Sequence, residues 1–380
     1  MSDLLVVAGE ASGDRAAAPV IARLRGVRAF GMGGGALARE GVELVADLRD
    51  LTAMGISEVA RRAYGVALSY AKLRAAIAKR KPAAALLVNY TEFNTRLAHT
   101  LWETGTRVLW YGAPQIWAWR SGRALPLRRA LDRLAVMLPF EEKLWRDLGV
   151  DAHYVGHPAL EDRRGSEHRD GARERLGMTP FAPAVAILPG SRPHEVRRLL
   201  EPMLAGFEEV RRDRASVDAR VLLAASLDDK TRRWAKDLAY KLELASADVD
   251  PRLGIASALP AFDAALCASG TASLECALAR VVPIVCYRVG WAAEAAARAL
   301  LETPHVALPN VLLGRPAFPE LLQRNAAASR IADELARVLD EREGYLESCR
   351  ELDALLGGHD SPSRAVARML EPWLSSRRTA

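Results

Sequence analysis

The chain has 380 residues, of which 50% are hydrophobic and 26% are charged. This length and composition predict a folded soluble protein with two domains. The four cysteines show no C-x-x-C spacing, which argues against a structural zinc site and favours a reducing, cytosolic compartment. The first residues contain too short an apolar run for a signal peptide, and no apolar stretch of about 18 residues predicts a membrane span.

The net charge is +6, from 53 basic and 47 acidic residues, and arginine supplies most of the basic side. Two interpretations stay open. The excess is either that of an ordinary solvated surface, or it favours anionic partners such as a nucleotide, a phosphorylated substrate or an acidic membrane face.

Short apolar runs alternate along the chain with segments whose apolar residues have helical spacing. The runs that predict buried strands form two series: LLVV (4–7), AALLV (84–88), RVLWY (107–111) and LAVM (134–137), then AVAIL (184–188), RVLLA (220–224), DAALCA (263–268) and VPIVCY (282–287). They predict an α/β fold with two Rossmann-like, doubly wound domains that face each other across a cleft. In such folds, ligands bind at the carboxyl ends of the strands.

A polar, charged stretch at 161–175 separates the two series and predicts a domain boundary. We expect an N-terminal domain over 1–170 and a second domain over 171–350. A C-terminal segment over 351–380 remains.

The C-terminal segment contains one clear helix pattern. Ser361 is suited to cap a helix that starts at Pro362. The apolar residues of this helix fall on one face, which must pack on another element: Val366, Met369, Leu370 and Trp373.

The first strand-to-helix junction reads AGEASGD (8–14), and Gly9 and Gly13 permit a tight turn there. Polar groups follow close to the start of the next helix: Glu10, Ser12 and Asp14. The junction is either an ordinary capped turn or part of a binding site. A second glycine cluster, GMGGG (31–35), lacks the G-x-G-x-x-G spacing of a dinucleotide site.

The stretch VNYTEFN (88–94) closes a buried strand and should deliver polar side chains into the cleft: Asn89, Tyr90, Glu92 and Asn94. Glu92 can accept a proton at neutral pH, whereas the amide of Asn89 cannot. Glu92 lies on the same side as Asn89 only if the backbone leaves strand geometry at Tyr90 or Thr91.

Two further loops of the first half carry candidate side chains. In YGAPQIWAWR (111–120), Trp117 lies two residues before a second tryptophan and close to Arg120. The tryptophans form either an aromatic pair at the edge of the core or a wall of the cleft with an arginine handle. In YVGHPAL (154–160), His157 is either structural or bonds a phosphate or hydroxyl.

Two junctions of the second half have the features of a diphosphate site. In LPGSRPHEVRRLLEPML (188–204), Gly190, Ser191 and Arg192 combine backbone N–H groups, a helix N-terminus and a guanidinium. The stretch lacks the spacing of a P-loop.

The second of these junctions, CASGTASLECAL (267–278), offers a similar turn at Ser269, Gly270 and Thr271. Glu275 follows one helical turn later and either holds two ribose hydroxyls or simply favours the start of the helix. No His and carboxylate cluster has metal-ligand spacing, so we expect no metal.

The segment 60–81 has apolar residues at helical spacing, surrounded by arginines and lysines: Val66, Tyr70, Leu73 and Ile77. It predicts a helix that either packs on a core or lies on anionic lipid.

These strings together resemble the lipid-A-disaccharide synthase family of glycosyltransferases, which has the GT-B fold. The likeness runs in order through almost the whole chain: AGEASGD, MGISEV (54–59), WAWR (117–120), LPFE (138–141), YVGHP (154–158), LPGSR (188–192), ASGTASLE (268–275), YR (287–288), LPN (308–310) and GRPAFPELLQ (314–323).

The resemblance implies an inverting transfer of 2,3-diacylglucosamine from UDP to the 6-hydroxyl of 2,3-diacylglucosamine 1-phosphate, which forms the β-1,6-linked lipid A disaccharide without a metal or other cofactor. Arg192 and the turns at 190–191 and 269–271 would neutralise the UDP leaving group, and Glu275 would hold the ribose. The acceptor side of the cleft would contain Ser12, Asp14, Trp117, Arg120, His157 and Asn310.

The resemblance also implies where the protein acts. Its partners would be the two acylated sugars and the cytoplasmic face of the inner membrane, as a peripheral protein, and not nucleic acid. Dimers that exchange carboxyl-terminal segments are known in the family, so the C-terminal helix would pack on its own N-terminal domain or on that of a second protomer.

The opening of the acceptor side departs from the family pattern. The family reads Asp-x-Pro-Asp-Phe-Asn, and the first aspartate is the favoured general base. This chain has Asn89 there, with Thr91 for the proline and Glu92 for the second aspartate. The leading hypothesis is an active transferase in which Glu92, or Glu10, is the base. The alternatives are a homologue that binds UDP-sugar or lipid without turnover, and a transferase with a changed acceptor.

Overall fold

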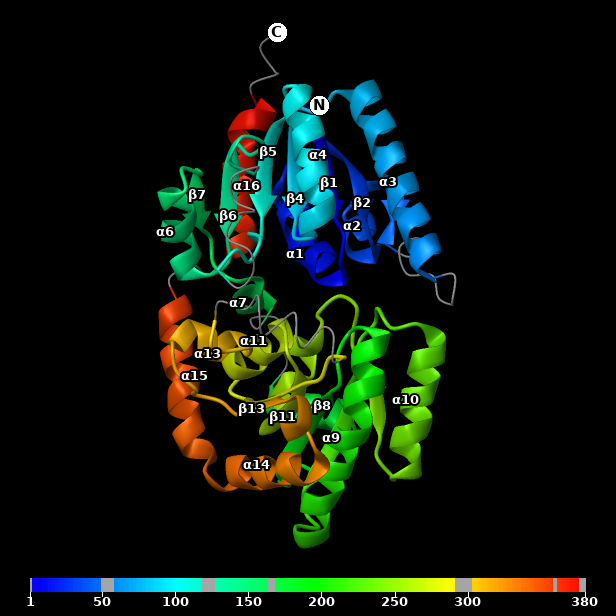
Figure 1. The fold of residues 1–380 in the computed structure, drawn as a ribbon, viewed down its shortest axis with the longest axis vertical. Helices are drawn as coiled ribbons and strands as arrows, with labels where there is room; N and C mark the ends of the chain where they lie inside the picture. The colour runs from blue at the N-terminus through cyan, green and yellow to red at the C-terminus, as the bar shows by residue number, and fades with distance from the viewer. Residues whose placement is uncertain are drawn as a thin grey trace. The chain divides into compact units, whose positions relative to one another are not determined.

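The computed structural model describes residues 2–48, 58–117, 127–162, 168–290, 303–357 and 361–375, and for 58–62 the backbone alone. The chain forms two compact units (Figure 1). The first comprises Met1–Pro158 with Gly358–Ala380, and the second is Ala159–Gly357. Both are α/β units with a parallel sheet, which is the predicted fold class.

The first unit contains a seven-stranded sheet in the order β3-β2-β1-β4-β5-β6-β7, in which all neighbours are parallel. Its strands are β1 (Ser2–Ala8), β2 (Val27–Gly33), β3 (Glu43–Asp47), β4 (Ala84–Val88), β5 (Arg107–Tyr111), β6 (Arg133–Val136) and β7 (Ala152–Tyr154). The four strands predicted in the first half correspond to β1, β4, β5 and β6. The sequence did not predict β2, β3 and β7, which lie toward the sheet edges.

Helices cover both faces of this sheet: α1 (Ala11–Arg23), α2 (Gly35–Arg39), α3 (Glu58–Arg80), α4 (Thr91–Glu103), α6 (Pro139–Asp147) and α16 (Pro362–Ser375). Successive residues of β1 point to opposite faces. Leu4 and Val6 join a core with α1, α2 and α16, whereas Leu5 and Val7 join one with α3, α4 and α6. The unit is therefore a three-layer sandwich with two buried cores.

The C-terminal helix α16 completes the first of these cores. Val366 and Leu370 are fully buried in it, with Met369 and Trp373 packed against them, as the apolar face of the sequence predicts. The guanidinium of Arg133 lies 5.0 Å from the centre of the Trp373 ring. In this single chain, α16 packs on its own N-terminal unit.

The second unit contains a six-stranded parallel sheet in the order β10-β9-β8-β11-β12-β13. The strands are β8 (Ala184–Leu188), β9 (Asp218–Leu223), β10 (Ser246–Asp248), β11 (Ala264–Ala268), β12 (Val282–Tyr287) and β13 (Glu320–Leu322). Its α-helices are α7 (Pro158–Asp162), α8 (Arg169–Arg175), α9 (Pro193–Asp213), α10 (Asp229–Lys241), α11 (Thr271–Leu278), α13 (Leu308–Leu313), α14 (Ala328–Asp340) and α15 (Arg342–Leu356). Short 3-10 turns lie at Ile255–Ser257, Leu259–Ala261 and Gln323–Asn325.

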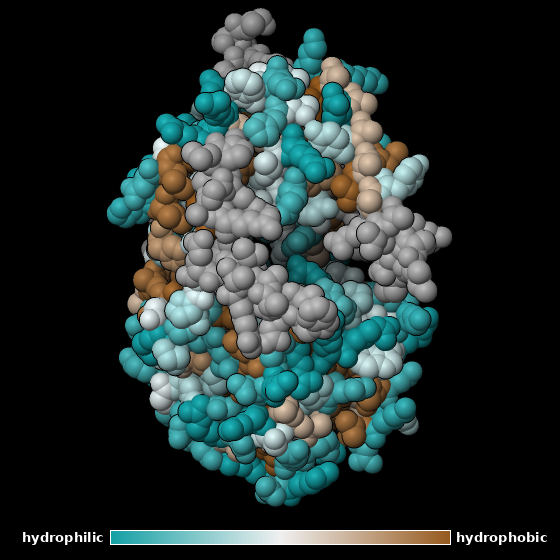
Figure 2. Space-filling model, in the orientation of Figure 1, coloured by the Kyte–Doolittle hydropathy of each residue, from teal (hydrophilic) through white to brown (hydrophobic). Residues whose placement is uncertain are grey.

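The chain enters the second unit at Ala159, earlier than the boundary expected at 170. The polar stretch also contains α8, which is anchored to this unit. Arg173 of α8 is 1% exposed, and its guanidinium donates to the carbonyl of Ala261 at 2.9 Å and to Asp263 at 3.3 Å. On the outer face shown in Figure 2, hydrophilic residues cover most of the described surface of the second unit.

The strand orders locate one switch point in each sheet. The chain runs outward from β1 toward β3 and from β4 toward β7, so the first sheet reverses between β1 and β4. The second sheet reverses between β8 and β11 in the same way. Ligands of open parallel sheets bind at such points, beyond the carboxyl ends of the strands.

Candidate active site

The switch point of the first sheet brings together the loops AGEASGD and VNYTEFN. Ala8 pairs with Val88, so β1 and β4 end side by side. A Cβ built on Gly9 would overlap the ring of Tyr90, so only glycine permits this approach. The two loops that the sequence singles out separately thus lie together at one edge of the first sheet.

The backbone leaves strand geometry at Asn89 and Tyr90, which both have a φ of +48°. Left-handed backbone at a residue other than glycine costs on the order of 1 kcal/mol, so the surrounding contacts must hold it. The N–H of Asn89 donates to the carbonyl of Tyr111 at 3.1 Å. The ring of Tyr90 stacks on that of Phe93 with centroids 5.3 Å apart.

Asn94 is a part of this turn and not of an open cleft. Its side chain is fully buried, and Nδ2 donates to the carbonyl of Asn89 at 2.9 Å and to that of Val88 at 3.3 Å. The buried side chain of Asn94 therefore stabilises the left-handed turn at Asn89 and Tyr90 through these backbone carbonyls.

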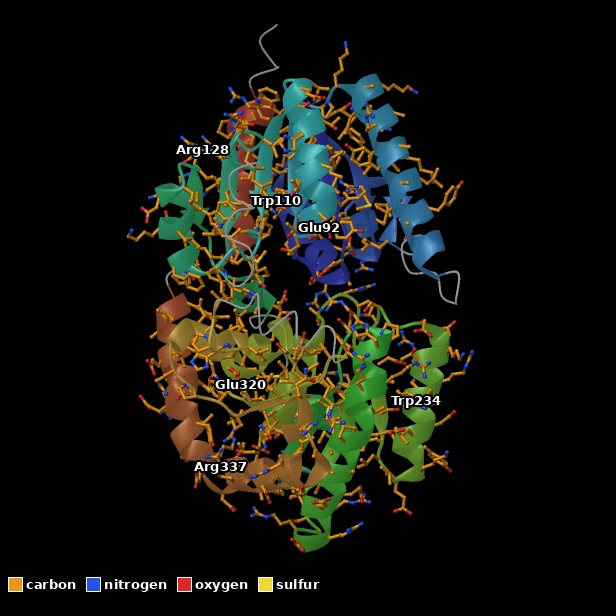
Figure 3. The ribbon with its side chains drawn as sticks, viewed as in Figure 1. Glu92, Trp110, Arg128, Trp234, Glu320 and Arg337 are labelled. Carbon is orange, nitrogen blue, oxygen red and sulfur yellow. The ribbon has the colours of Figure 1, made fainter. Side chains whose placement is uncertain are left out.

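The turn places Glu92 in the first turn of α4 with its side chain exposed (Figure 3). The side chain of Asn89 lies against the loop after β5, since a Cβ built on Gly112 would overlap its Oδ1. Glu10, the N-cap residue of α1, is also exposed, and Ser12 is half-buried in the first turn of that helix. Both candidate bases thus lie at helix starts beside the first switch point.

Asp14, expected on the acceptor side of the cleft, caps α2. It is 5% exposed and accepts hydrogen bonds from the backbone N–H groups of Gly34 at 2.7 Å, Ala36 at 2.9 Å and Leu37 at 3.2 Å. The glycine cluster at 31–35 lets its backbone approach this carboxylate closely. The role of Asp14 is therefore to hold the β2–α2 loop.

Trp117 is bound to a buried carboxyl group. Its Nε1–H donates to Oε1 of Glu141 at 3.0 Å, and its ring meets that of Phe140 edge to face. Glu141 is 2% exposed and also accepts from the N–H of Leu138 at 3.2 Å. Burial raises the pKa of Glu141 to about 7, while these hydrogen bonds oppose the shift. Sequence reasoning did not single out Glu141 as a site residue, although it ends the LPFE string.

The remaining first-unit candidates differ in outcome. His157 is 5% exposed, and burial lowers its pKa to about 4. The imidazole is therefore neutral near pH 7 and can offer a hydrogen bond but not a positive charge. Arg120 lies outside the described residues.

In the second unit, the loop after β8 has the predicted exposed turn. Gly190 has a φ of +122°, and Ser191 and Arg192 are exposed at the start of α9. Glu195 Oε2 accepts from the N–H of Ser191 at 3.1 Å and from that of Arg192 at 3.2 Å. Its Oε1 accepts from the Arg192 guanidinium at 2.9 Å. The backbone N–H groups and the guanidinium that are predicted to bind a diphosphate therefore bind the Glu195 carboxylate in this structure.

The loop after β11 lies at the same switch point. Gly270 has a φ of +152° and is exposed together with Thr271, the first residue of α11. Ser269 Oγ donates to the carbonyl of Val306 at 3.1 Å. Glu275 is 8% exposed on the second turn of α11. The sheet order thus brings the turns of the two predicted donor loops to adjacent strand ends.

Tyr287, the last residue of β12, lies close to this region. Burial raises its pKa, the charge of Glu195 adds to the shift, and that of Arg192 opposes it.

Asn310, also expected on the acceptor side, lies in the second unit and is fully buried. Its Oδ1 accepts from the N–H of Phe318 at 2.9 Å, and its Nδ2 donates to Glu320 at 2.8 Å. Glu320, labelled in Figure 3, also accepts from the N–H of Ala307 at 3.0 Å. Asn310 and Glu320 therefore fix the loop before α13, and in this structure Asn310 faces no open space.

Among the described residues, no three His, Cys, Asp or Glu side chains are grouped to hold a metal ion. No helix in the described part of the chain is long and apolar enough to cross a membrane.

Two parallel-sheet α/β units, each with its candidate residues at a switch point, define the GT-B class of fold. The structure resembles UDP-GlcNAc 2-epimerase from Neisseria meningitidis bound to UDP-GlcNAc, with a TM-score of 0.69 and 11% identity over 97% of this chain and 100% of that one. It also resembles the calicheamicin glycosyltransferase CalG4, with a TM-score of 0.61 and 14% identity over 100% and 99% of the two chains.

The sequence defines the family. A model of the family described as lipid-A-disaccharide synthetase matches residues 4–365. The lipid-A-disaccharide synthase of Myxococcus xanthus (strain DK1622) is 40% identical over 378 residues, which cover 97% of each chain. The chain belongs to the lipid-A-disaccharide synthase family, and it is a hexosyltransferase of lipid A biosynthesis.

Proposed function

We propose that the chain transfers 2,3-diacylglucosamine from UDP to the 6-hydroxyl of 2,3-diacylglucosamine 1-phosphate, with inversion at the anomeric carbon. The observation that carries the donor assignment is the pair of glycine turns, at Gly190 and Gly270, which precede α9 and α11 at the switch point of the second sheet. Backbone N–H groups at helix starts are suited to phosphate oxygens.

In the proposed reaction, the acceptor oxygen attacks the anomeric carbon while the bond from this carbon to the UDP oxygen breaks. The leaving UDP carries the negative charge away, so Arg192 and the N–H groups of both turns would stabilise it. A diphosphate that binds here would displace the Glu195 carboxylate from the N–H groups of Ser191 and Arg192. Glu275 would hold the ribose from the second turn of α11.

The acceptor hydroxyl must lose a proton, and we propose Glu92 as the base. The left-handed turn at 89–90 starts α4 directly after β4, which puts Glu92 at the carboxyl edge of the sheet. The side-chain NH₂ of Asn89 would donate a hydrogen bond to the oxygen of the same hydroxyl and orient it. Glu10, at the N-cap position of α1 beside this turn, is the second candidate.

The test combines binding with turnover. UDP binding by calorimetry reports the donor site, and disaccharide formation from the two acylated sugars reports the reaction. UDP binding with disaccharide formation would support the proposal. A folded protein that binds UDP but forms no disaccharide would contradict it.

The identity of Asn89 favours one alternative, a homologue that binds its substrates with little turnover. The variant Asn89→Asp distinguishes this binding homologue from an active transferase. If the wild type is almost inactive and Asn89→Asp forms product about 10²–10⁴ times faster, the chain is a binder that lacks its base. If both proteins turn over at similar rates, this alternative is wrong.

We also propose that α3 meets an anionic membrane surface. Leu73 and Ile77 of its predicted apolar face are buried in the core, so this face is not available to lipid. Tyr64 and Leu68 are instead 70% and 42% exposed, one helical turn apart. Lys72 lies a further turn along the helix and is exposed. Tyr64→Ser with Leu68→Ser should weaken sedimentation with phosphatidylglycerol vesicles, and unchanged sedimentation would contradict the proposal.

We further propose that the protein acts at the cytoplasmic face of the inner membrane. There it would form a homodimer in which the two protomers exchange their C-terminal segments. The supporting feature is that α16 follows 358–360 and contributes buried residues to the first unit, so an exchanged copy would find a ready apolar face. Light scattering on purified protein should give twice the chain mass, and the monomer mass would contradict exchange.

A further inference from the structure

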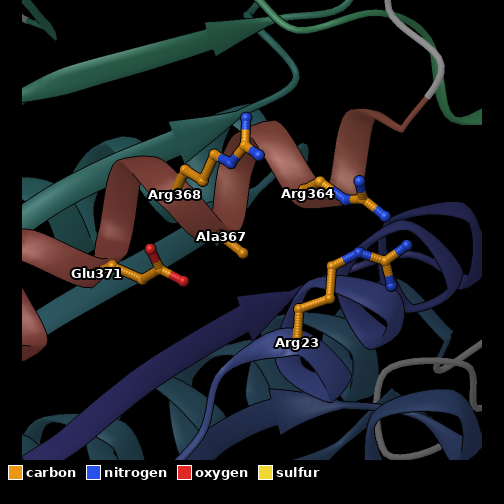
Figure 4. Close-up of a pocket in the computed structure, with 5 residues that line it drawn as sticks. All are labelled: Arg23, Arg364, Ala367, Arg368 and Glu371. Atoms are coloured by element: carbon orange, nitrogen blue, oxygen red, sulfur yellow. The ribbon is translucent and has the colours of Figure 1, made fainter.

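A pocket of about 430 Å³ lies between α1 and α16, on the first unit (Figure 4). Three arginines, one carboxylate and one small residue line it: Arg23, Arg364, Ala367, Arg368 and Glu371. None of these residues belongs to the candidate active site. The pocket is therefore a separate feature of the C-terminal helix.

The packing of two helices builds the pocket. Arg23 lies in the last turn of α1, and its guanidinium donates to Ser361 Oγ at 3.2 Å and to the carbonyl of Pro19 at 3.5 Å. Arg364 and Arg368 lie one turn apart on α16, and the buried Ala367 between them leaves space. Figure 4 shows the guanidinium groups of Arg23 and Arg364 directed toward the same part of the pocket.

The charges are placed unfavourably for the protein alone. Arg364 lies in the first turn of α16, where the positive end of the helix dipole repels a cation. Arg364 and Arg368 are like charges at i,i+4, which destabilise a helix. Glu371 offsets one of the three positive charges. Within the described residues, neither Arg364 nor Arg368 has a side-chain hydrogen bond or ion pair.

We propose that the pocket between α1 and α16 binds a phosphate group. Guanidinium groups pair with phosphate oxygens in a bidentate manner, and an anion there would remove both repulsions. The phosphate can belong to a soluble phosphate ester or to the headgroup of an anionic phospholipid. The pocket carries no residue of the transfer reaction, so the proposal is independent of the donor and acceptor assignments.

The experiment compares three double variants with the wild type in the full-length protein. The double variant Arg364→Gln with Arg368→Gln removes the two free guanidinium groups. The double variant Arg364→Lys with Arg368→Lys keeps both positive charges but loses the bidentate geometry of the guanidinium group. Arg233→Gln with Arg330→Gln is the matched control, because both positions are exposed helix sites in the second unit with the same change of charge.

Two probes separate the sources of the phosphate. Glycerol 1-phosphate is titrated by calorimetry at fixed ionic strength with the donor site saturated by UDP, and sedimentation is measured with vesicles of phosphatidylglycerol or phosphatidylcholine. The glutamine pair should weaken binding about tenfold or more, the lysine pair less, and the control pair little. A loss with glycerol 1-phosphate identifies a soluble ester, and a loss with phosphatidylglycerol alone identifies a headgroup.

The proposal is wrong if the glutamine pair binds both probes as tightly as the control pair, or if the wild type binds neither probe. Thermal unfolding and UDP affinity confirm that each variant is folded. Should the glutamine pair fail to fold, Arg364→Gln alone provides the test, since this exposed side chain makes no contact that the helix needs.

Discussion

The indole Nε1–H of Trp117 donates a 3.0 Å hydrogen bond to Oε1 of Glu141, a carboxyl group that is 2% exposed. Trp117 belongs to the segment that the sequence places in the cleft, and Glu141 starts α6 directly after β6. A carboxyl group with a pKa near 7 therefore holds the side chain of Trp117.

Glu141→Gln should make the protein less sensitive to pH. The pKa of Glu141 is about 7 in the folded protein and 4.5 without the fold, so the folded state binds more protons between these values. The free energy of unfolding must then fall as pH rises through this window, by about 3 kcal/mol. Urea unfolding should show this loss in the wild type and in Glu142→Gln, a more exposed neighbour. Equal pH profiles for Glu141→Gln and the wild type would contradict the account.

Gly112→Ala should disturb the acceptor side through Asn89. Gly112 has a φ of +83°, and its added Cβ would overlap Asn89 Oδ1. Gly41→Ala is the matched control, because Gly41 has a φ of +79° but no atom within 4 Å of its Cβ position. Both variants should lose about 1 kcal/mol of stability from backbone strain, and Gly112→Ala should lose more stability and also kcat. Equal kcat values in the two variants would show that the overlap with Asn89 does not matter.

Asp14→Asn should destabilise the first unit by about 3 kcal/mol. The amide keeps one acceptor oxygen and presents an NH₂ group to backbone N–H groups that now donate to both carboxylate oxygens. Urea unfolding measures the loss, with Asp333→Asn at an exposed position of α14 as the control. If Asp14→Asn is as stable as the control but loses activity, Asp14 acts in the reaction and not as a cap.

Arg192→Lys should weaken UDP binding about tenfold, because an ammonium cannot replace the bidentate guanidinium. Arg212→Lys, at the exposed C-terminal end of the same helix, should bind UDP like the wild type. Calorimetry on the three proteins checks this. An unchanged affinity for Arg192→Lys would remove Arg192 from the donor site.

The sequence predicted the fold well where apolar runs are continuous. AALLV and RVLWY coincide with β4 and β5, both of which lie inside the sheet. It missed β7 and β10, because each has only three residues, AHY and SAD, which form no continuous apolar run and lie at sheet edges. Short edge strands form because a neighbour offers hydrogen bonds, which their own composition does not reveal.

The candidate site was less predictable, because polar side chains form hydrogen bonds with groups that are distant in the sequence. Asp14 binds N–H groups 20 to 23 residues away, and Asn310 binds the backbone of Phe318, so both are committed inside the fold. The left-handed turn at Asn89 and Tyr90 could not be predicted, because neither residue is a glycine. Glu195 carried a usable signal, since a glutamate three residues after the N-cap residue can accept from the N–H of that residue, as in one half of a capping box.

We propose above that Glu92 is the general base of an active lipid-A-disaccharide synthase, in which Asn89 stands where the family usually has an aspartate. The most direct test of this claim is the rate of disaccharide formation from UDP-2,3-diacylglucosamine and 2,3-diacylglucosamine 1-phosphate by the wild type, Glu92→Gln and the control Glu103→Gln, an exposed glutamate at the other end of α4. We predict that the wild type and Glu103→Gln form product, and that Glu92→Gln lowers kcat about 10²–10⁴-fold with unchanged UDP affinity. A Glu92→Gln variant as fast as the wild type would contradict the claim.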